Sequence, residues 1–295
     1  MEITTDTNEM VRFPGMKLRG KKRYETLYHY TSFDAFVKIW LSKKFKLSPI
    51  TKANDIEELY KPWKAKNFQQ IPLSYAYSDI LNAYKQASFT MDYDSYIKGC
   101  MSPMMWGLYG GRKEGVCIEF KLDKIQVPKG CIQKPIIYKD ILKPPRVFEL
   151  DKEIKTIADV RGFIKKKSKD IFFTKLKCWA GENEYRIISD RYEYLNIENA
   201  ITAVYLTSYE SEECLMVEKL VRDAIPVMYM HYYTVENKYD IPIVSDTANS
   251  REQVLKAKNN PKNALNSIAQ QAKDYYEASK NDENASLLNI NYKLN

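Results

Sequence analysis

The sequence has few histidines, few glycines and no paired cysteines. Only two histidines, His29 and His231, occur in 295 residues, which excludes a metal site built from several imidazoles. The five cysteines include no C-x-x-C pair, so neither a zinc site nor a disulfide framework is supported. We therefore expect no metal cofactor, and we expect the cysteines to be buried thiols in a reducing compartment.

The chain also lacks a long apolar run. No stretch of about 18 apolar residues is present, so a transmembrane helix is not expected. Residues 1–20 are polar with scattered charge and have no apolar core of the kind found in signal peptides. These observations predict a cytoplasmic protein with no membrane partner.

Apolar and charged residues are present in ordinary globular proportions, at 44% and 28%. The formal net charge is +8, a modest basic excess that permits a phosphate-bearing partner such as a nucleotide or nucleic acid. A surface solvated by lysine explains the same excess. Neither G-x-G-x-x-G nor the P-loop motif occurs, so the common nucleotide-binding folds are not supported.

Three segments differ in composition. Residues 1–21 are expected to form a flexible lead, and residues 22–245 a single domain. Residues 246–295 form a polar tail, in which the 3–4 spacing of apolar residues predicts one amphipathic helix that binds a partner. Short strand pairs dominate the second half of the domain, which predicts an α+β fold with a mostly antiparallel sheet and flanking helices.

Hydrophobic patterning places the elements of that domain. Strands are predicted at residues 24–30, 45–48, 115–121, 131–138, 184–189, 201–206, 226–233 and 239–244. Helices are predicted at residues 54–87 with interruptions, 102–109, 151–175 and 210–224. A further helix follows the first strand, where Thr31 and Asp34 resemble a capping box. Residues 88–99 are predicted to be a loop.

Four local patterns carry a resemblance to a known family. They are LYHYTS at 27–32, NDIEE at 54–58, MWGLYGGRKEGVCIEF at 105–120 and KLKCWAGENEYRI at 175–187. In this order and spacing they resemble the bacterial domain of unknown function 2971 (DUF2971) family, over roughly residues 24–244. The family label implies no activity.

A second resemblance does imply an activity. The first strand ends in His29-Tyr30-Thr31, Ser102 leads into a helix carrying Tyr109, and a later strand opens with Asn183-Glu184-Tyr185. This order is similar to that of NAD-dependent ADP-ribosyltransferases of the His-Tyr-Glu class. The resemblance implies their fold, NAD as substrate, and a macromolecular acceptor, either nucleic acid or protein.

The same resemblance assigns roles to residues. Glu184 orients the ribose hydroxyls and stabilises an oxocarbenium-like transition state, and Tyr109 stacks on the nicotinamide. His29 and Thr31 hydrogen-bond the other ribose. Tyr30 stands where the class usually has glycine. An alternative to an active enzyme is therefore an inactive relative that keeps the cleft but has it filled by Tyr30.

Ser102 and Arg186 complete the predicted dinucleotide site, with Arg186 or Lys175 facing a phosphate. Glu182 remains open as an alternative key carboxylate. Glu184 and Arg186 lie two apart on a strand and so on one face, which equally predicts a structural ion pair.

A different class of function also fits the sequence. The lysine run at 165–169, together with the tail, suits a non-catalytic module that binds nucleic acid or a protein partner. If the chain is instead an enzyme, analogy suggests a bacterial toxin or phage-defence effector. Trp106 and Trp179 are expected to belong to the core and not to a cofactor platform.

Overall fold

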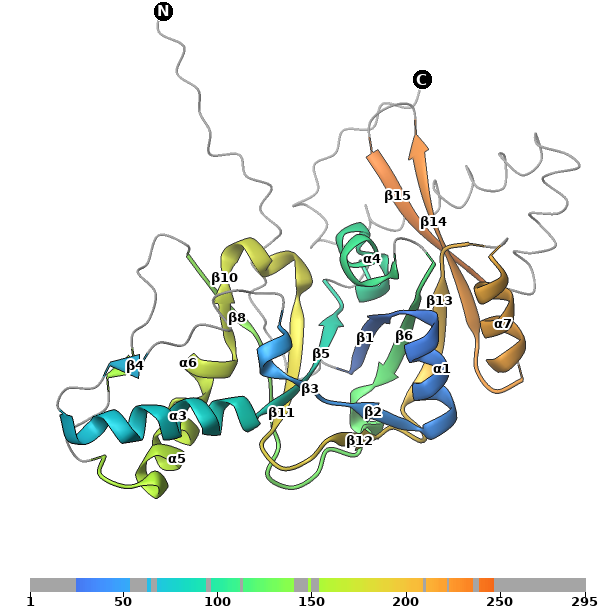
Figure 1. Cartoon of the computed structure of the whole chain (residues 1–295). Helices are drawn as coiled ribbons and strands as arrows, with labels where there is room; N and C mark the ends of the chain where they lie inside the picture. The colour runs from blue at the N-terminus through green and yellow to red at the C-terminus, as the bar shows by residue number, and fades with distance from the viewer. Residues whose placement is uncertain are drawn as a thin grey trace, which may run out of the picture.

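The computed structural model describes residues 25–53, 63–64, 68–93, 97–111, 114–140, 148–149, 154–208, 211–221, 223–235 and 239–246. Within these residues the fold is mixed α/β, with one large, mostly antiparallel sheet and several helices (Figure 1). The predicted lead at 1–21 and the predicted tail, apart from residue 246, lie outside the described residues.

Nine strands form the large sheet. They are β1 (Thr26–Thr31), β3 (Ser48–Pro49), β5 (Lys85–Met91), β6 (Val116–Lys121), β7 (Ile132–Pro135), β11 (Glu184–Ser189), β13 (Ile201–Leu206), β14 (Val227–Val235) and β15 (Tyr239–Asp246). Eight of them run in the order β15-β14-β13-β6-β1-β5-β11-β7, and β3 pairs with β5. β13 and β14 pair in parallel, whereas the other neighbours are antiparallel.

Shorter elements complete the described fold. The remaining strands, which form two-stranded sheets, are β2 (Lys44–Lys46), β4 (Trp63–Lys64), β8 (Ile137–Lys139), β9 (Phe148–Glu149), β10 (Thr174–Leu176) and β12 (Tyr194–Asn196). The α-helices are α1 (Phe33–Ser42), α3 (Ile71–Ala83), α4 (Pro103–Tyr109), α5 (Ile157–Lys166), α6 (Ser168–Phe172) and α7 (Glu212–Val221). The 3-10 helices are η1 (Ile50–Lys52), η2 (Phe68–Gln70), η3 (Gly99–Met101), η5 (Leu122–Lys124) and η6 (Lys177–Glu182).

Strand register divides the large sheet into two faces. Leu27 lies opposite Met91 and belongs to the core under α1 and α7, so we call this side the α1 face. Tyr28, Thr90 and Glu184 form one row across β1, β5 and β11 on the other side, which we call the α4 face. Because side chains alternate along a strand, neighbouring residues in β1 point to opposite faces.

Three hydrophobic clusters stabilise these layers. The largest joins the α1 face to α1 and α7, and the second joins α3, α5 and α6 to the end of the sheet near β11. The third lies under α4 and contains Tyr28, Tyr30, Met105 and Trp106. Figure 1 shows α1 and α7 at one end of the sheet and α3, α5 and α6 at the other.

The N-cap of the first helix, α1, lies one residue later than the sequence predicts. Ser32 is the N-cap, and its hydroxyl accepts a hydrogen bond from the Ala35 amide at 3.4 Å. Thr31 instead ends β1 in extended conformation, opposite Val116. The prediction of Thr31 as the cap was wrong because the strand continues through it.

Three other element predictions need correction. Residues 88–91 belong to β5, a central strand, and not to a loop. The single helix predicted at 151–175 is instead α5 and α6, separated at Lys167 and followed by β10, because residues 174–176 pair with β8. Of the helical stretch predicted at 54–87, the described residues contain η2 and α3, but the prediction is wrong at Trp63–Lys64, which form β4, and at residues 85–87, which belong to β5. Its predicted first turn lies outside the described residues.

Candidate active site

The predicted site residues come from two strands of the large sheet and from the helix α4. His29 and Thr31 are on β1, Ser102 and Tyr109 bracket α4, and Glu184 opens β11. β1 and β11 both pair with β5, so they are separated by a single strand. The described structure therefore brings the three motifs into one region, but not onto one face.

His29 lies on the α1 face, away from Glu184. Its ring meets the ring of Phe45 edge-on at 4.6 Å between centroids, and that of Phe89 at 6.0 Å. Nδ1 lies 3.1 Å from the Ser88 carbonyl oxygen. Because a carbonyl only accepts, Nδ1 carries the hydrogen and donates it. Burial lowers the pKa of His29 to about 4, although the Ser88 carbonyl acts in the opposite direction.

The neutral state of His29 predicts a loss of stability in mild acid. Its pKa is about 6.5 in an unfolded chain and about 4 in the fold, so the unfolded state binds more protons between these values. Stability should be full above pH 6.5 and fall as the pH drops toward 4, by at most about 1.4 kcal/mol per pH unit. Urea denaturation of the wild type and His29→Phe at pH 7, 5.5 and 4.5 measures the difference. Parallel losses in both proteins would contradict the assignment.

Ser102 and Thr31 are nearly buried. Ser102 is the N-cap of α4, and its hydroxyl accepts a hydrogen bond from the Met105 amide at 3.3 Å. The side chain of Tyr93 also hydrogen-bonds Ser102. Thr31 shares the α1 face with His29, because it lies two residues further along β1. The structure therefore does not bring Thr31 and Ser102 together.

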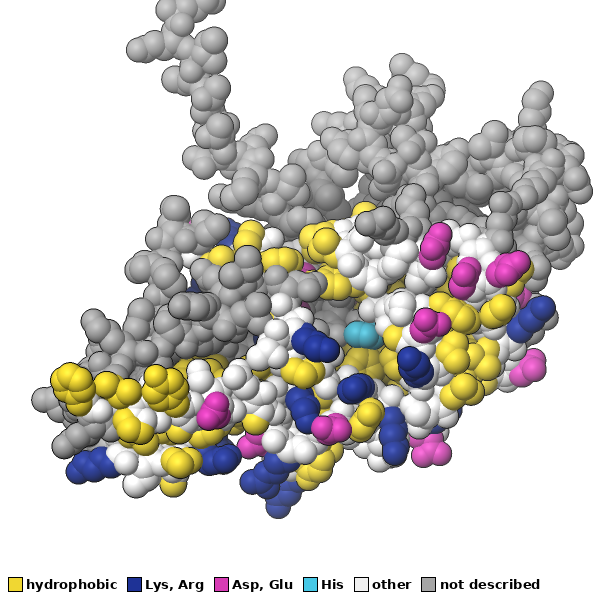
Figure 2. Space-filling view, viewed as in Figure 1, with side chains coloured by type: hydrophobic (Ala, Val, Ile, Leu, Met, Phe, Trp, Pro, Cys, Tyr) yellow, Lys and Arg dark blue, Asp and Glu magenta, His cyan; other side chains and the backbone are white. Residues whose placement is uncertain are grey.

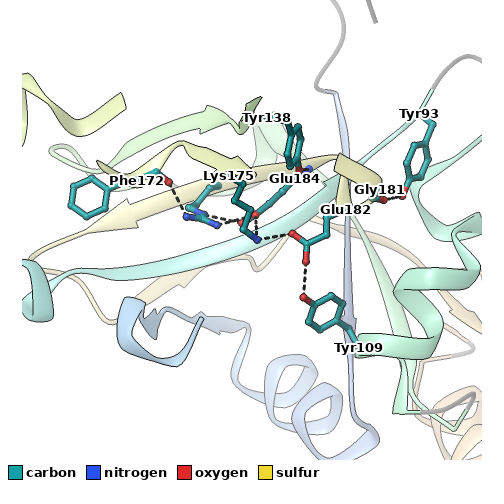
Figure 3. Close-up of polar contacts among 9 residues, drawn as sticks. Tyr93, Tyr109, Tyr138, Phe172, Lys175, Gly181, Glu182 and Glu184 are labelled. Atoms are coloured by element: carbon teal, nitrogen blue, oxygen red, sulfur yellow. Dashed lines mark hydrogen bonds and ion pairs between the residues drawn. The ribbon is translucent and has the colours of Figure 1, made fainter. Parts of the chain in front are cut away.

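A charged cluster lies on the α4 face, formed by Lys175, Glu182, Glu184 and Arg186 (Figure 3). Lys175 Nζ contacts Glu182 Oε2 at 2.6 Å and Glu184 Oε2 at 3.0 Å. All four side chains are at most 8% exposed. Two cations and two carboxylates thus compensate one another in a site nearly closed to water.

Glu184 is held most firmly within this charged cluster. Arg186 Nε donates to one of its carboxylate oxygens at 2.8 Å, and Nη2 donates to the other at 2.9 Å. Arg186 Nη1 donates to the Phe172 carbonyl at 2.8 Å. Burial alone raises the pKa of Glu184, but Arg186 and Lys175 together lower it to about 2. The ion pair that the strand spacing predicted is therefore present.

Tyr109 joins the charged cluster through Glu182. Its hydroxyl donates to Glu182 Oε1 at 2.6 Å, across 73 positions of sequence. Tyr109 and Trp179 are both half-buried, and Lys175 Nζ lies 5.4 Å from the centre of the Trp179 ring. The two rings are therefore more accessible than the charges beside them. Lys175, predicted to face a phosphate, instead contacts both carboxylates.

Two tyrosines near the charged cluster were not found by sequence reasoning, and the contacts of Asn183, part of the predicted strand-opening motif, were not anticipated. The Tyr138 hydroxyl accepts a hydrogen bond from the Glu184 amide at 2.9 Å, and the Tyr93 hydroxyl donates to the Gly181 carbonyl. Asn183 adopts left-handed backbone conformation, with a φ of 44°, and its side chain donates to the carbonyls of β5 and the residue after it. With 23 tyrosines in the chain, no signal distinguished these two.

Tyr30 and Trp106 fill the space between β1 and α4. The Tyr30 hydroxyl donates to the Gly99 carbonyl at 2.5 Å, and its ring meets that of Trp106 edge-on at 5.1 Å. Trp106 is 2% exposed and belongs to the core, as the sequence predicts. Tyr30 thus packs on the α4 face, whereas His29 beside it points to the α1 face.

Comparison with known families finds a similarity over the central part of the chain. Residues 105–187 match the model of Protein of unknown function (DUF2971). The DUF2971 match confirms the corresponding resemblance and spans α4 to β11, and so Tyr109 and the whole charged cluster. No curated protein and no solved structure matches the chain. None of the described helices combines the length and apolar character needed to cross a bilayer.

Proposed function

We propose that the protein transfers ADP-ribose from NAD to a macromolecule, either nucleic acid or protein. The observation that carries this proposal is the 2.6 Å hydrogen bond between Tyr109 and Glu182. It joins an accessible aromatic ring to a carboxylate, the two groups this chemistry requires, at a place where the chain order resembles the His-Tyr-Glu class. A role as a toxin or phage-defence effector in the cytoplasm is part of the proposal by analogy.

The reaction breaks the bond between the ribose C1′ and the nicotinamide nitrogen. The electron pair leaves with nicotinamide, C1′ becomes oxocarbenium-like, and an acceptor oxygen or nitrogen attacks C1′ and loses a proton. A fixed carboxylate beside C1′ stabilises the positive charge that develops. Glu182 is oriented for this role by Tyr109 and Lys175. The half-buried rings of Tyr109 and Trp179 offer faces on which nicotinamide stacks.

This proposal changes the role of Glu184. Both of its carboxylate oxygens are engaged by Arg186, and one also contacts Lys175. Both oxygens of Glu182 are engaged as well, but one of its partners is Tyr109, whose ring is only half-buried. We therefore propose Glu184 as a positioning residue that holds Lys175 against Glu182, and Glu182 as the carboxylate that meets the ribose. His29 and Thr31 lie on the opposite face and are not part of this proposed site.

Substitutions at Tyr109 and Glu182 test the proposal. Purified protein is incubated with radiolabelled NAD and cell lysate, and both label transfer and nicotinamide release are measured. Glu182→Gln should reduce kcat/KM by about a hundredfold, because the developing charge loses its carboxylate. Tyr109→Phe should reduce it by about tenfold, since the ring remains but Glu182 loses one hydrogen bond.

An exposed tyrosine provides the matched control. Tyr75 is 70% exposed and is not part of the charged cluster, so Tyr75→Phe should retain full activity. If folded wild-type protein neither transfers label nor releases nicotinamide with any lysate, the proposal fails.

One observation favours a second candidate, a non-catalytic module that binds nucleic acid. Lys165, Lys166 and Lys167 are exposed at the end of α5, where α6 begins. Such a module would bind without consuming NAD, and its affinity would fall steeply with salt. It would be unaffected by Glu182→Gln, which separates it from the enzyme.

A further inference from the structure

The two-stranded ribbon formed by β2 and β12 has a buried side and an exposed side of different chemistry. Phe45 and Leu195 are paired in register and are 3% and 0% exposed in the main core. Lys44, Lys46 and Tyr194 are exposed on the other side, with Lys46 paired to Tyr194. We call this exposed side, together with Tyr192, the ribbon surface.

The ribbon surface and its surroundings carry an excess of positive charge. Around it, Lys85 contacts Glu193 at 2.6 Å, and Arg191 contacts Asp190 at 3.9 Å. The nearby Lys43 interacts with Glu198 and lies over the Trp40 ring, 3.3 Å from its centre. Glu193 also interacts with Lys46, so Lys44 and the four other cations share three carboxylates, and the region keeps two more positive than negative charges. Figure 2 shows Lys and Arg side chains spread over the centre of this face, with fewer Asp and Glu there.

Exposed aromatic rings accompany the charge. Tyr192 and Tyr194 are 39% and 45% exposed, and as residues two apart they stand near one another along the chain. Lysine on an exposed strand also discourages unwanted strand pairing, but tyrosine does not serve that purpose. A surface that combines cations with exposed rings instead matches the way proteins hold single-stranded nucleic acid, by backbone attraction and base stacking.

We propose that the ribbon surface binds single-stranded nucleic acid, with Lys44 and Lys46 facing phosphates and Tyr194 stacking on a base. Strand geometry separates Lys44 and Lys46 by about 7 Å, a spacing of the order of successive phosphates in an extended strand. In a duplex the bases are stacked inside, so its phosphates can contact the two lysines but no base is free to stack on Tyr194. This binding requires no NAD and stands apart from the activity proposed above.

Fluorescence anisotropy with the full chain tests the inference. The probes are a 20-nucleotide oligo-dT, an oligo-rU of equal length and a 20-base-pair DNA duplex, each over a series of salt concentrations. The wild type should bind both single strands more tightly than the duplex. Tyr194→Ala should weaken single-strand binding by about fivefold or more, whereas Tyr194→Phe should retain it. The double variant K44E/K46E should flatten the salt slope by about 1.4.

A second double variant controls for overall charge. K155E/K219E makes the same change in net charge at two exposed lysines that lie outside the ribbon surface and outside the lysine run of α5, so it should leave oligo-dT binding at least severalfold tighter than K44E/K46E does. Thermal melting verifies that each variant is folded, which is expected because all the altered side chains are exposed. Three results would overturn the proposal: no single-strand binding, equal losses in the two double variants, or equal duplex affinity with no effect of Tyr194→Ala.

Discussion

Replacing Glu184 by alanine should lower the free energy of unfolding by about 3–5 kcal/mol. The substitution removes the carboxylate that receives two hydrogen bonds from Arg186 and one contact from Lys175. Both cations are almost inaccessible to water and would remain without their shared partner. Removing one member of a buried ion pair costs this much because an uncompensated charge stays in the interior.

Urea denaturation at pH 7 measures the effect of Glu184→Ala. The matched control is Glu193→Gln, which also breaks an ion pair with a lysine, Lys85, but at a site 59% exposed on the carboxylate side. This control should leave stability nearly unchanged, because water solvates the remaining charge. If the two variants unfold at the same urea concentration, the charged cluster is hydrated and its structural role is wrong. Lost activity in a Glu184 variant must be judged against this loss of stability.

Trp106→Ala should be destabilising by a similar amount, about 3–5 kcal/mol. The side chain is 2% exposed, and truncating a buried tryptophan loses its burial and leaves a cavity. Its Nε1 donates to the Cys100 carbonyl at 2.8 Å, so the substitution also leaves that carbonyl without its donor. Tyr30 would also lose its edge-on contact with the Trp106 ring.

Thermal melting of Trp106→Ala and Trp106→Phe tests whether Trp106 serves the packing of the core or the binding of a ligand. Phenylalanine keeps most of the apolar area but not the donor, so its melting temperature should lie between those of the wild type and Trp106→Ala. A Trp106→Ala protein that melts like the wild type but no longer releases nicotinamide would instead place Trp106 in a cofactor platform.

The sequence predicts elements well where one pattern is strong. β11 was predicted at its observed bounds, 184–189, and Pro103 with Gly110 correctly delimits α4. Such segments combine β-branched and aliphatic residues, or a proline at the first helical turn, with clear stop signals. The mostly antiparallel sheet followed from the same short strands and is confirmed.

β5 shows where this approach fails. Its residues, KQASFTM, alternate apolar Ala87, Phe89 and Met91 with polar side chains, but lysine and alanine are poor strand formers, so the pattern is short and weak and is easily missed. The strand is nevertheless central, because its partners β1 and β11 supply the apolar cross-strand neighbours. Tertiary pairing therefore reinforces a local pattern that already indicates a strand.

The candidate site was predictable in its residue types but not in its geometry. Tyr109 and Glu182 were both identified from sequence, yet their contact depends on how α4 packs against η6, 73 positions away. His29 illustrates the opposite case. Strand alternation places His29 and Tyr30 on opposite sides of the sheet. Only the register through β5 shows that Glu184 lies on the same side as Tyr30.

The position of β1 has a consequence for the order of folding. This strand is the first described in the chain, yet it lies in the middle of the sheet between β5 and β6, whose residues follow about 60 to 90 positions later. β11 then pairs with β5 across a further hundred positions. Such distant pairing slows folding, because the entropy of closing long loops is lost before the contacts between the strands form. On the ribosome β1 therefore has no partner in the large sheet until β5 has emerged and gains its second partner only with β6, so its apolar residues are open to aggregation during this interval.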